Sequence, residues 1–215
     1  MRKSGISFRV MLALLALVLA AGAVALLAIG GSTGSKARAQ ALADHFDAAA
    51  VLEPAKPAPP LALHNYLGKP VNIASYRGKA VLVTFLYTSC PDICPLITSD
   101  LRVALNLMGR KTASKVQIIA VSVDPHGDTP KAVAAFLARH GMTGRMQYLI
   151  GSAKELGPVW KAWGVGAERD ADQPQFVNHT GIVYGITGSG KRLTLYAASF
   201  QPSEIAHDVP LLAAR

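Results

Sequence analysis

The chain has 215 residues, of which 51% are hydrophobic, and a formal net charge of +9 at pH 7. Its length predicts one globular domain with additional segments. Five of the positive charges lie before residue 40, where no acidic residue occurs, so the remainder of the chain carries about +4. The remaining Lys and Arg residues are scattered and form no recognisable nucleic-acid motif, which argues against a nucleic-acid-binding protein.

The beginning of the chain has the composition of a membrane segment. Three basic residues precede the uncharged residues 10–34, of which residues 10–29 are mostly apolar. About twenty apolar residues suffice to cross a bilayer as a helix, whereas the apolar core of a signal peptide is shorter. We therefore expect residues 1–39 to be an inner-membrane anchor with the domain on the periplasmic side, because basic residues favour the cytoplasm. The sequence Ala37-Arg38-Ala39 leaves open cleavage and release into the periplasm.

Residues 40–60 contain four prolines near their end and predict an extended linker, followed by a domain over residues 61–215. The first half of this domain is expected to contain a hairpin over residues 61–73, strands at 80–87 and 116–123, and a helix between them that ends near residue 108.

The second half of the domain continues the alternation of strands and helices. We expect a helix over 130–140, a strand at 147–150, a helix over 152–163, a long loop over 164–178, a hairpin with strands 179–187 and 192–198, and a final helix over 202–212. Continuous apolar strands alternating with helices predict an α/β domain with a mostly parallel central sheet flanked by helices. This order is compatible with a thioredoxin-like layout to which an N-terminal β-hairpin is added.

Cys90 and Cys94 are the only cysteines, and both lie at the corner between a buried strand and the next helix. If the helix begins near Pro91, two residues four positions apart lie on one face, and the electropositive helix end favours thiolates. A structural disulfide would close so short a loop with little effect on the unfolded chain. The position of the pair, where α/β proteins place ligands, therefore predicts chemistry.

The Cys-x3-Cys spacing is one residue wider than that of thioredoxin-type exchange enzymes and is closer to a two-point metal clamp. His179 is the best third ligand, because it follows the long loop and opens a strand expected beside the central one; a structural histidine is the alternative. His126 lies in the loop after the next buried strand and is expected to be solvated. Two thiolates and one imidazole suit Cu(I) or Cu(II) better than structural zinc or an iron–sulfur cluster, which use about four protein ligands. The other histidines are expected to be ordinary surface residues: His45, His64, His140 and His207.

These residues resemble the Sco/SenC family of thioredoxin-like copper-binding proteins involved in cytochrome c oxidase assembly. The specific match is Cys90-Pro91-Asp92-Ile93-Cys94-Pro95, and the resemblance covers roughly residues 60–200. Supporting matches, in order, are Gly68-Lys69-Pro70-Val71, Tyr76-Arg77-Gly78-Lys79, Val121-Ser122-Val123-Asp124-Pro125, Asp128-Thr129-Pro130 and Val177-Asn178-His179-Thr180.

The resemblance implies that Cys90, Cys94 and His179 are the copper ligands and that Asp124 lies near them, where a carboxylate can orient ligands. One departure is Asn178, where the family usually has Asp; an amide carries no charge, so metal affinity or partner docking is expected to differ. The loop after Asp124 also has His126 and Gly127 where family members often carry a charged pair. Neither departure changes the three ligands.

The function implied by the resemblance is that of a copper metallochaperone. It would deliver copper by ligand exchange to the CuA-type site of a cytochrome c oxidase subunit, as a monomer and an assembly factor more than an enzyme. The alternative is a thiol–disulfide oxidoreductase, in which Cys90 and Cys94 form a redox-active pair that reduces the cysteines of the oxidase subunit or of another extracytoplasmic partner. A weaker third possibility is a peroxidase or redox sensor. His179 favours the chaperone, since disulfide exchange needs no histidine.

Overall fold

The structure is a computed structural model that describes residues 45–169, 177–179 and 181–215. The chain divides into residues 1–45 and a compact unit, Phe46–Arg215, whose described part is presented below. In the described part of the chain, no helix is both long and apolar enough to cross a bilayer. The expected anchor at residues 1–39 lies outside the described residues.

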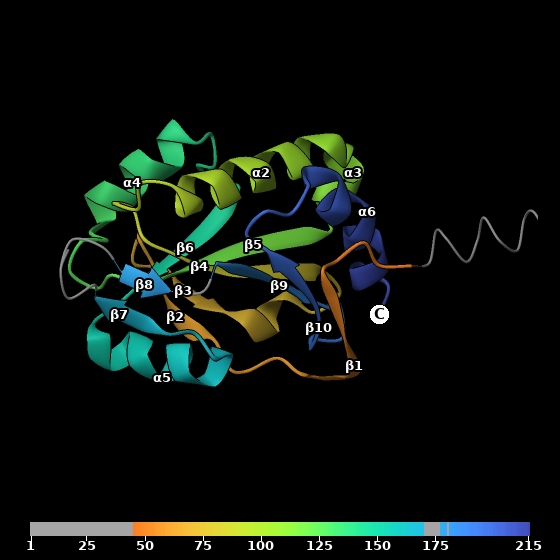
Figure 1. The fold of residues 1–215 in the computed structure, drawn as a ribbon, viewed down its shortest axis with the longest axis horizontal. Coiled ribbons are helices and arrows are strands. Elements are labelled where there is room, and N and C mark those ends of the chain that lie inside the picture. The colour runs from red at the N-terminus through yellow and green to blue at the C-terminus, as the bar shows by residue number, and fades with distance from the viewer. Residues whose placement is uncertain (1–44, 170–176, 180) are drawn as a thin grey trace, which may run out of the picture. The chain divides into compact units, whose positions relative to one another are not determined.

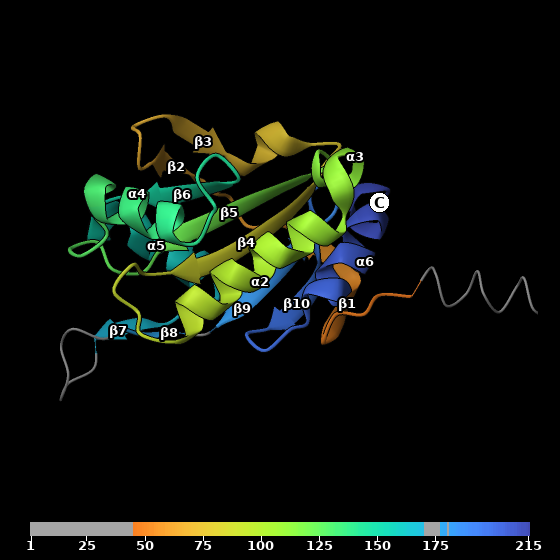
Figure 2. The same cartoon turned by 90° about the horizontal axis from the view of Figure 1, so that it is seen from above.

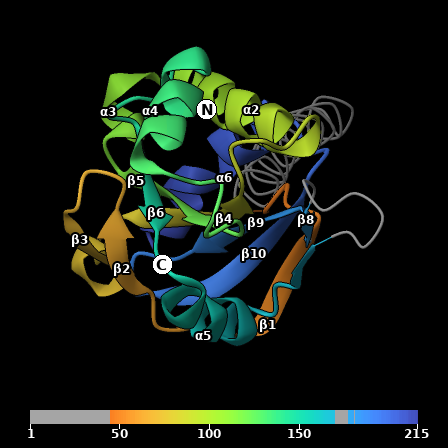
Figure 3. The same ribbon diagram turned by 90° about the vertical axis from the view of Figure 1, so that its left-hand side faces the viewer.

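An eight-stranded sheet in the order β1-β10-β9-β4-β5-β6-β2-β3 forms the centre of this unit (Figure 1). Helices α2 and α4 cover one face, and α5 covers the other (Figure 3). The strands are β1 (Ala50–Pro57), β2 (Ala62–Asn65), β3 (Pro70–Asn72), β4 (Ala80–Leu86), β5 (Val116–Ser122), β6 (Met146–Ile150), β9 (Ile182–Ile186) and β10 (Lys191–Ala197), and a separate hairpin contains β7 (Ala167–Arg169) and β8 (Val177–His179). The helices are η1 (Ile73–Tyr76), α2 (Ile93–Leu107), α3 (Gly109–Ala113), α4 (Pro130–Arg139), α5 (Ala153–Trp163) and α6 (Pro202–Ala213).

The sheet is mixed, so the expectation of a mostly parallel sheet was wrong. Only the pairs β4–β5 and β5–β6, which are linked through crossover helices, are parallel. The pairs β2–β3 and β9–β10 are antiparallel because a short connection joins the two strands and forces the chain to reverse. These hairpins adjoin the parallel centre through β2–β6 and β9–β4, which are also antiparallel. The expected hairpin before the central strand is present as β2 and β3 and lies at one edge of the sheet.

The range expected to be a linker, residues 40–60, contains strand β1, which pairs with β10 at the other edge of the sheet. Proline is tolerated there because an edge strand has one side that needs no ladder hydrogen bonds, and the register shifts between Val51 and Lys56. Phe46 is also part of the core, with 5% of its surface exposed. The described domain therefore starts about fifteen residues earlier than the proline content suggested.

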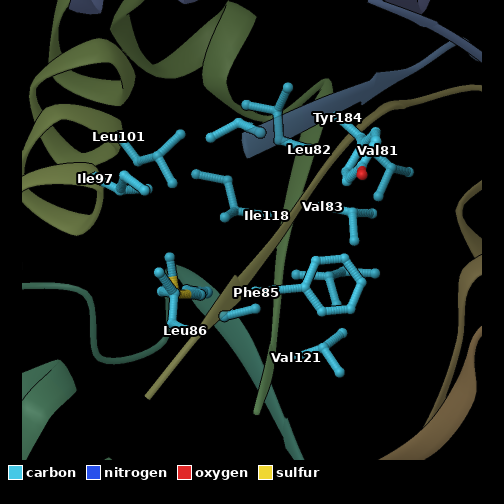
Figure 4. Close-up of a cluster of buried hydrophobic side chains, with 14 of the residues drawn as sticks. Val81, Leu82, Val83, Phe85, Leu86, Ile97, Leu101, Ile118, Val121 and Tyr184 are labelled. Carbon is cyan, nitrogen blue, oxygen red and sulfur yellow. The ribbon is translucent and has the colours of Figure 1, made fainter. Parts of the chain in front are cut away.

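The core lies on both sides of β4, whose seven residues are all buried. Alternate side chains of a strand point to opposite faces. Leu82 and Leu86 point toward α2, which carries Ile97 and Leu101, and Val81, Val83 and Phe85 point toward the other face (Figure 4). Burial of these side chains on α2, spaced three to four residues apart, fixes the helix over the end of the central strands.

A buried carboxylate fastens the start of the domain to its last helix. Asp208 on α6 is fully buried. Its two oxygens accept hydrogen bonds from the backbone N–H groups of Asp47 at 2.9 Å and Ala48 at 3.0 Å. The hydroxyl of Tyr196 on β10 donates to Asp208 at 2.8 Å. The residues that lead into β1 are therefore held by the same group that joins α6 to the sheet.

Candidate metal centre

The corner between β4 and α2 brings the two cysteines together. Helix α2 begins at Ile93, two residues later than the expected start at Pro91, and Asp92 caps it by accepting a hydrogen bond from the Ile93 N–H. The N–H of Cys94 donates to Sγ of Cys90 at 3.4 Å. Cys94 therefore lies in the first turn of α2, and the sulfur of Cys90 lies against the N–H groups of that turn.

Both cysteines are thiols, and both are buried: Cys94 completely, and Cys90 with 6% of its surface exposed. A hydrogen bond with Cys90 contributes most, followed by burial, to raising the pKa of Cys94 well above its ordinary value. The thiol of Cys90 in turn donates to Oδ1 of the exposed Asp92 at 3.6 Å. Both causes favour the protonated form of Cys94, and metal binding would release this proton.

Tyr87 connects this corner to β8. It follows β4, and burial is the main cause that raises its pKa to about 12. Hydrogen bonds link its side chain to Cys90 and to the backbone of Val177, the first residue of β8; the bond from Val177 lowers the pKa, and the one with Cys90 raises it. His179 is the last residue of the same three-residue strand. The tyrosine thus holds the strand that carries His179 beside Cys90.

Gly181 brings the chain after β8 against the same helix. A Cβ atom at Gly181 would lie 3.4 Å from Cγ1 of Ile93 and 3.9 Å from Cδ1 of Ile97, both on the first turns of α2. The residue two positions after His179 therefore lies against the first turns of α2. The backbone of His179 pairs with Ala167 in the β7–β8 hairpin, and its side chain is outside the described structure.

Asp128, which sequence reasoning missed, contacts the turn that carries Cys90. Its Oδ1 accepts a hydrogen bond from the N–H of Thr88 at 2.7 Å. Its Oδ2 accepts from Oγ of Ser122 at 2.6 Å and from the hydroxyl of Tyr148 at 2.9 Å. Burial raises the pKa of Asp128, and these hydrogen bonds partly oppose the rise. The position of Asp128 after a buried strand was visible in the sequence, but its burial among three donors was not.

Asp124, the carboxylate named from the sequence, shapes the loop after β5. It is buried, its N–H donates to Oγ of Ser122 at 3.1 Å, and its Oδ1 accepts from the N–H of His126 at 3.2 Å. A Cβ atom at Gly127 would overlap Oδ2 of Asp124, so only glycine fits there beside this carboxylate. The histidine itself is exposed, in agreement with the expectation for His126.

One further group in the described residues combines metal-ligating side chains: Asp47, His207 and Asp208. Nδ1 of His207 lies 2.8 Å from Oδ1 of Asp208 and 3.5 Å from Oδ2 of Asp47. His207 was expected to be an ordinary surface residue, but it is half-buried against this pair. Because Asp208 already accepts hydrogen bonds from two backbone N–H groups and a tyrosine, we interpret this group as the fastening described above.

The donor set at the β4–α2 corner fits a soft metal. The two cysteine side chains are hydrogen-bonded to each other, and the strand that carries an imidazole is held beside them by Tyr87 and Gly181. Thiolate and imidazole donors in low number suit copper. The described residues near this corner supply no additional cysteine, since the chain has only two.

Comparison with known proteins gives a consistent result. A family model described as SCO1/SenC matches residues 49–214. The "Protein SCO1 homolog, mitochondrial" of Mus musculus is 27% identical over 154 residues, which cover 70% of this chain and 54% of the relative. The chain spans about half the length of the curated relatives it matches first.

Two solved structures extend this comparison. The copper-bound ScoI of Bradyrhizobium japonicum is 31% identical, with a TM-score of 0.62, and the match covers 71% of this chain and 97% of that chain. BsSco, described as a member of the Sco family of cytochrome c oxidase assembly proteins with a disulfide switch, is 27% identical, with a TM-score of 0.62 over 76% of this chain and 97% of that chain.

Proposed function

The chain belongs to the SCO1/SenC family, and from this premise we propose that it binds copper and delivers it during assembly of cytochrome c oxidase. The observation that carries the proposal is the convergence of two thiols and a histidine-bearing strand on one corner. The Cys94 N–H reaches Sγ of Cys90 at 3.4 Å, and the residues on both sides of His179 contact the same corner. Copper-bound ScoI, which is 31% identical, supports copper as the metal.

Copper would be held by Cys90, Cys94 and His179. Three ligands leave copper a coordination position for an incoming donor, so transfer would proceed by stepwise replacement of these ligands by a thiolate or imidazole of the receiving protein. Cys94 is completely buried, whereas Cys90 is followed by the exposed residues Pro91 and Asp92. The incoming ligand would therefore approach over the Cys90 side. The receiving protein would be the oxidase subunit that carries the CuA-type site.

The remaining parts of the proposal concern location and assembly. Residues 1–39 would hold the chain in the inner membrane with the domain on the periplasmic side, or be cleaved to release a soluble periplasmic domain. The apolar residues 10–29 and their basic flank support the anchor. The protein would act as a monomer and would not bind nucleic acid.

A second function, thiol–disulfide exchange, is favoured by the hydrogen bond between the two cysteines and by the disulfide switch described for BsSco. In this reaction the thiolate of one cysteine attacks a partner disulfide, and the other cysteine resolves the mixed disulfide. Cys90 and Cys94 together lose two electrons and two protons and form a disulfide, and the partner disulfide gains them and becomes two thiols. The partner's cysteines must be reduced before they can bind copper, and exchange in this direction would reduce them.

The test is anaerobic copper loading of the reduced domain, residues 46–215. We expect about one equivalent of copper to remain bound, and the Cu(II) form to show sulfur-to-copper charge-transfer absorption. A domain that retains no copper, but whose Cys90–Cys94 pair reduces a disulfide substrate reversibly, would replace the first function by the second. A domain that does neither would contradict both.

A further inference from the structure

The helical layer formed by α2, α3 and α4 carries an excess of positive charge. Residues 93–115 and 130–145, which are these helices and the turns after them, contain seven Lys and Arg residues and one acidic residue. Since the chain after residue 40 carries +4 in total, everything outside these two stretches sums to −2. The nearest acid on the same helices is Asp100 on α2. The domain is therefore electrically polarised, with its basic side on this layer.

The described structure leaves these cations without acidic partners. Within residues 45–169, 177–179 and 181–215, the ion pairs join only His207 to Asp47 and Asp208. Arg145 donates to the neutral Oδ1 of Asn106 at 2.8 Å, which does not cancel its charge. The positive potential of the layer consequently extends into solvent.

A cavity of about 330 Å³ lies between α2 and the end of α4 in this layer. It is lined by Arg102, Arg139, His140, Ser99, Ala138 and Gly141, and by no carboxylate. The side chain of Arg102 lies across Gly141. A Cβ atom added at Gly141 would be 3.0 Å from Cδ of Arg102. The guanidinium groups of Arg102 and Arg139 lie beside the hydroxyl of Ser99. Each guanidinium group is planar and offers several N–H donors, which can bind two oxygens of one phosphate group.

An exposed leucine stands at the end of the same layer. Leu107, the last residue of α2, is 61% exposed, and α3, which follows it, buries none of its residues. Arg110 and Lys111 on α3 follow this leucine by three and four positions. An exposed apolar side chain next to basic residues is typical of surfaces that rest on the interface of an anionic bilayer.

We propose that the basic layer, defined as α2, α3 and α4 with the Arg102–Arg139 cavity and Leu107, docks on a membrane leaflet that contains anionic phospholipid. The cavity would take a headgroup phosphate, and Leu107 would enter the acyl boundary. Cations spread over three helices suit a broad charged plane, and the exposed leucine suits a lipid phase more than the charged surface of an acidic protein. Leu107 lies thirteen positions after Cys94 on α2, about 20 Å along the helix, so docking at the Leu107 end leaves the cysteine corner accessible.

The test uses residues 46–215, which form one compact unit and contain the whole described core. Co-sedimentation with vesicles of phosphatidylcholine alone is compared with vesicles that also contain phosphatidylglycerol, at low and at high salt. We expect binding only to the anionic vesicles and its loss at high salt. The measurement needs no copper, so its result is independent of the proposed copper function.

The decisive comparison uses two pairs of substitutions that remove equal charge. Replacing Arg102 and Arg139 by Gln is expected to weaken binding to anionic vesicles about 25-fold, since each cation near such a surface contributes about fivefold. The matched control replaces Lys154 and Lys161, both exposed on α5 at the opposite face of the sheet, by Gln and should leave binding unchanged. Leu107→Gln should weaken binding without changing the salt dependence.

Three results would overturn the proposal. The first is equal binding to neutral and anionic vesicles. The second is an equal loss for both substitution pairs, which would show that net charge alone acts. The third is binding of inorganic phosphate or of an acidic protein through Arg102 and Arg139 with no binding to anionic vesicles. Unchanged circular dichroism and melting temperature of the variants establish that each result concerns the surface and not the fold.

Discussion

The N–H of Thr88 donates a hydrogen bond of 2.7 Å to Oδ1 of Asp128, forty residues further along the chain. The other carboxylate oxygen accepts from Ser122 on β5 and from Tyr148 on β6. Three elements that meet only in the folded domain therefore share one buried acceptor. Because Thr88 lies two residues before Cys90, the position of the cysteine turn depends on a residue outside the cysteine motif.

Replacing Asp128 by Ala is expected to destabilise the domain by about 3 kcal/mol or more, since three donors lose their acceptor in the interior. Asp128→Asn should lower the free energy of unfolding by less, because the amide oxygen can still accept a hydrogen bond from the N–H of Thr88. Copper affinity should fall in the same order, as the turn before Cys90 loses its support. Urea unfolding of the copper-free domain and copper competition titrations measure the two effects.

Asp100→Ala is the matched control for this experiment, since it removes a partly exposed carboxylate from α2. Its free energy of unfolding should change by less than about 0.5 kcal/mol, as for most surface positions. Equal copper affinity in Asp128→Ala and the unaltered domain would show that the hydrogen bond to Thr88 does not position the cysteines.

His179→Ala is expected to lower copper affinity by about 100-fold or more, because even residues that only support a metal ligand contribute 10- to 100-fold. The reduction of a disulfide substrate by Cys90 and Cys94 should persist, since the exchange reaction uses only the sulfurs. His126→Ala, a change at an exposed loop position, is the control and should retain copper. Copper binding that survives in His179→Ala would reject the histidine as a ligand.

Gly181→Val is expected to weaken copper binding without touching a ligand. The new Cβ would lie 3.0 Å from Cβ of Ala198 and 3.4 Å from Cγ1 of Ile93, so the strand that follows His179 must move away from α2. Such overpacking costs about 1–3 kcal/mol of stability. Gly157→Ala on α5, where nothing lies within 4 Å, should instead stabilise the domain by about 0.5–1 kcal/mol and leave copper affinity unchanged.

His140 is expected to titrate below the ordinary histidine value of about 6.5. Burial is the main cause that lowers its pKa, and the charges of Arg139 and Arg102 lower it further. A depressed folded-state pKa means that the unfolded chain binds the proton more tightly, so this histidine contributes stability that is lost as the pH falls below about 6.5. Proton NMR should show the low pKa, and Arg139→Gln should raise it; His140→Gln should lose less stability between pH 7 and pH 5 than the unaltered domain.

The central part of the fold could be predicted because its sequence pattern is strong. The run of seven consecutive apolar or β-branched residues before Cys90 predicted strand β4. Thr129 followed by Pro130 predicted the start of helix α4. Family membership was confirmed, since the family model matches residues 49–214. Copper as the ligand type is supported by the copper-bound relative, while the ligand set itself stays a prediction.

The parts that sequence reasoning missed depend on contacts between distant segments. Prolines 54 and 57 suggested a linker, but pairing with β10 makes that segment an edge strand. The hairpins β2–β3 and β9–β10 could be predicted locally, but the antiparallel pairing of β2 with β6 and of β9 with β4 joins distant segments, and no local pattern records it. Asp128 looked like a loop residue because its three donors come from residues 88, 122 and 148.

The buried carboxylate of Asp208 determines where mechanical load enters the domain. Any pull transmitted through the chain before Phe46 reaches the hydrogen bonds from Asp47 and Ala48 to Asp208 first, and then strand β1. Strand β1 lies at the opposite end of the domain from β8 and the first turn of α2 (Figures 1 and 2). Tension applied where the domain begins is therefore met at the opposite end from the first turn of α2, which carries Cys94.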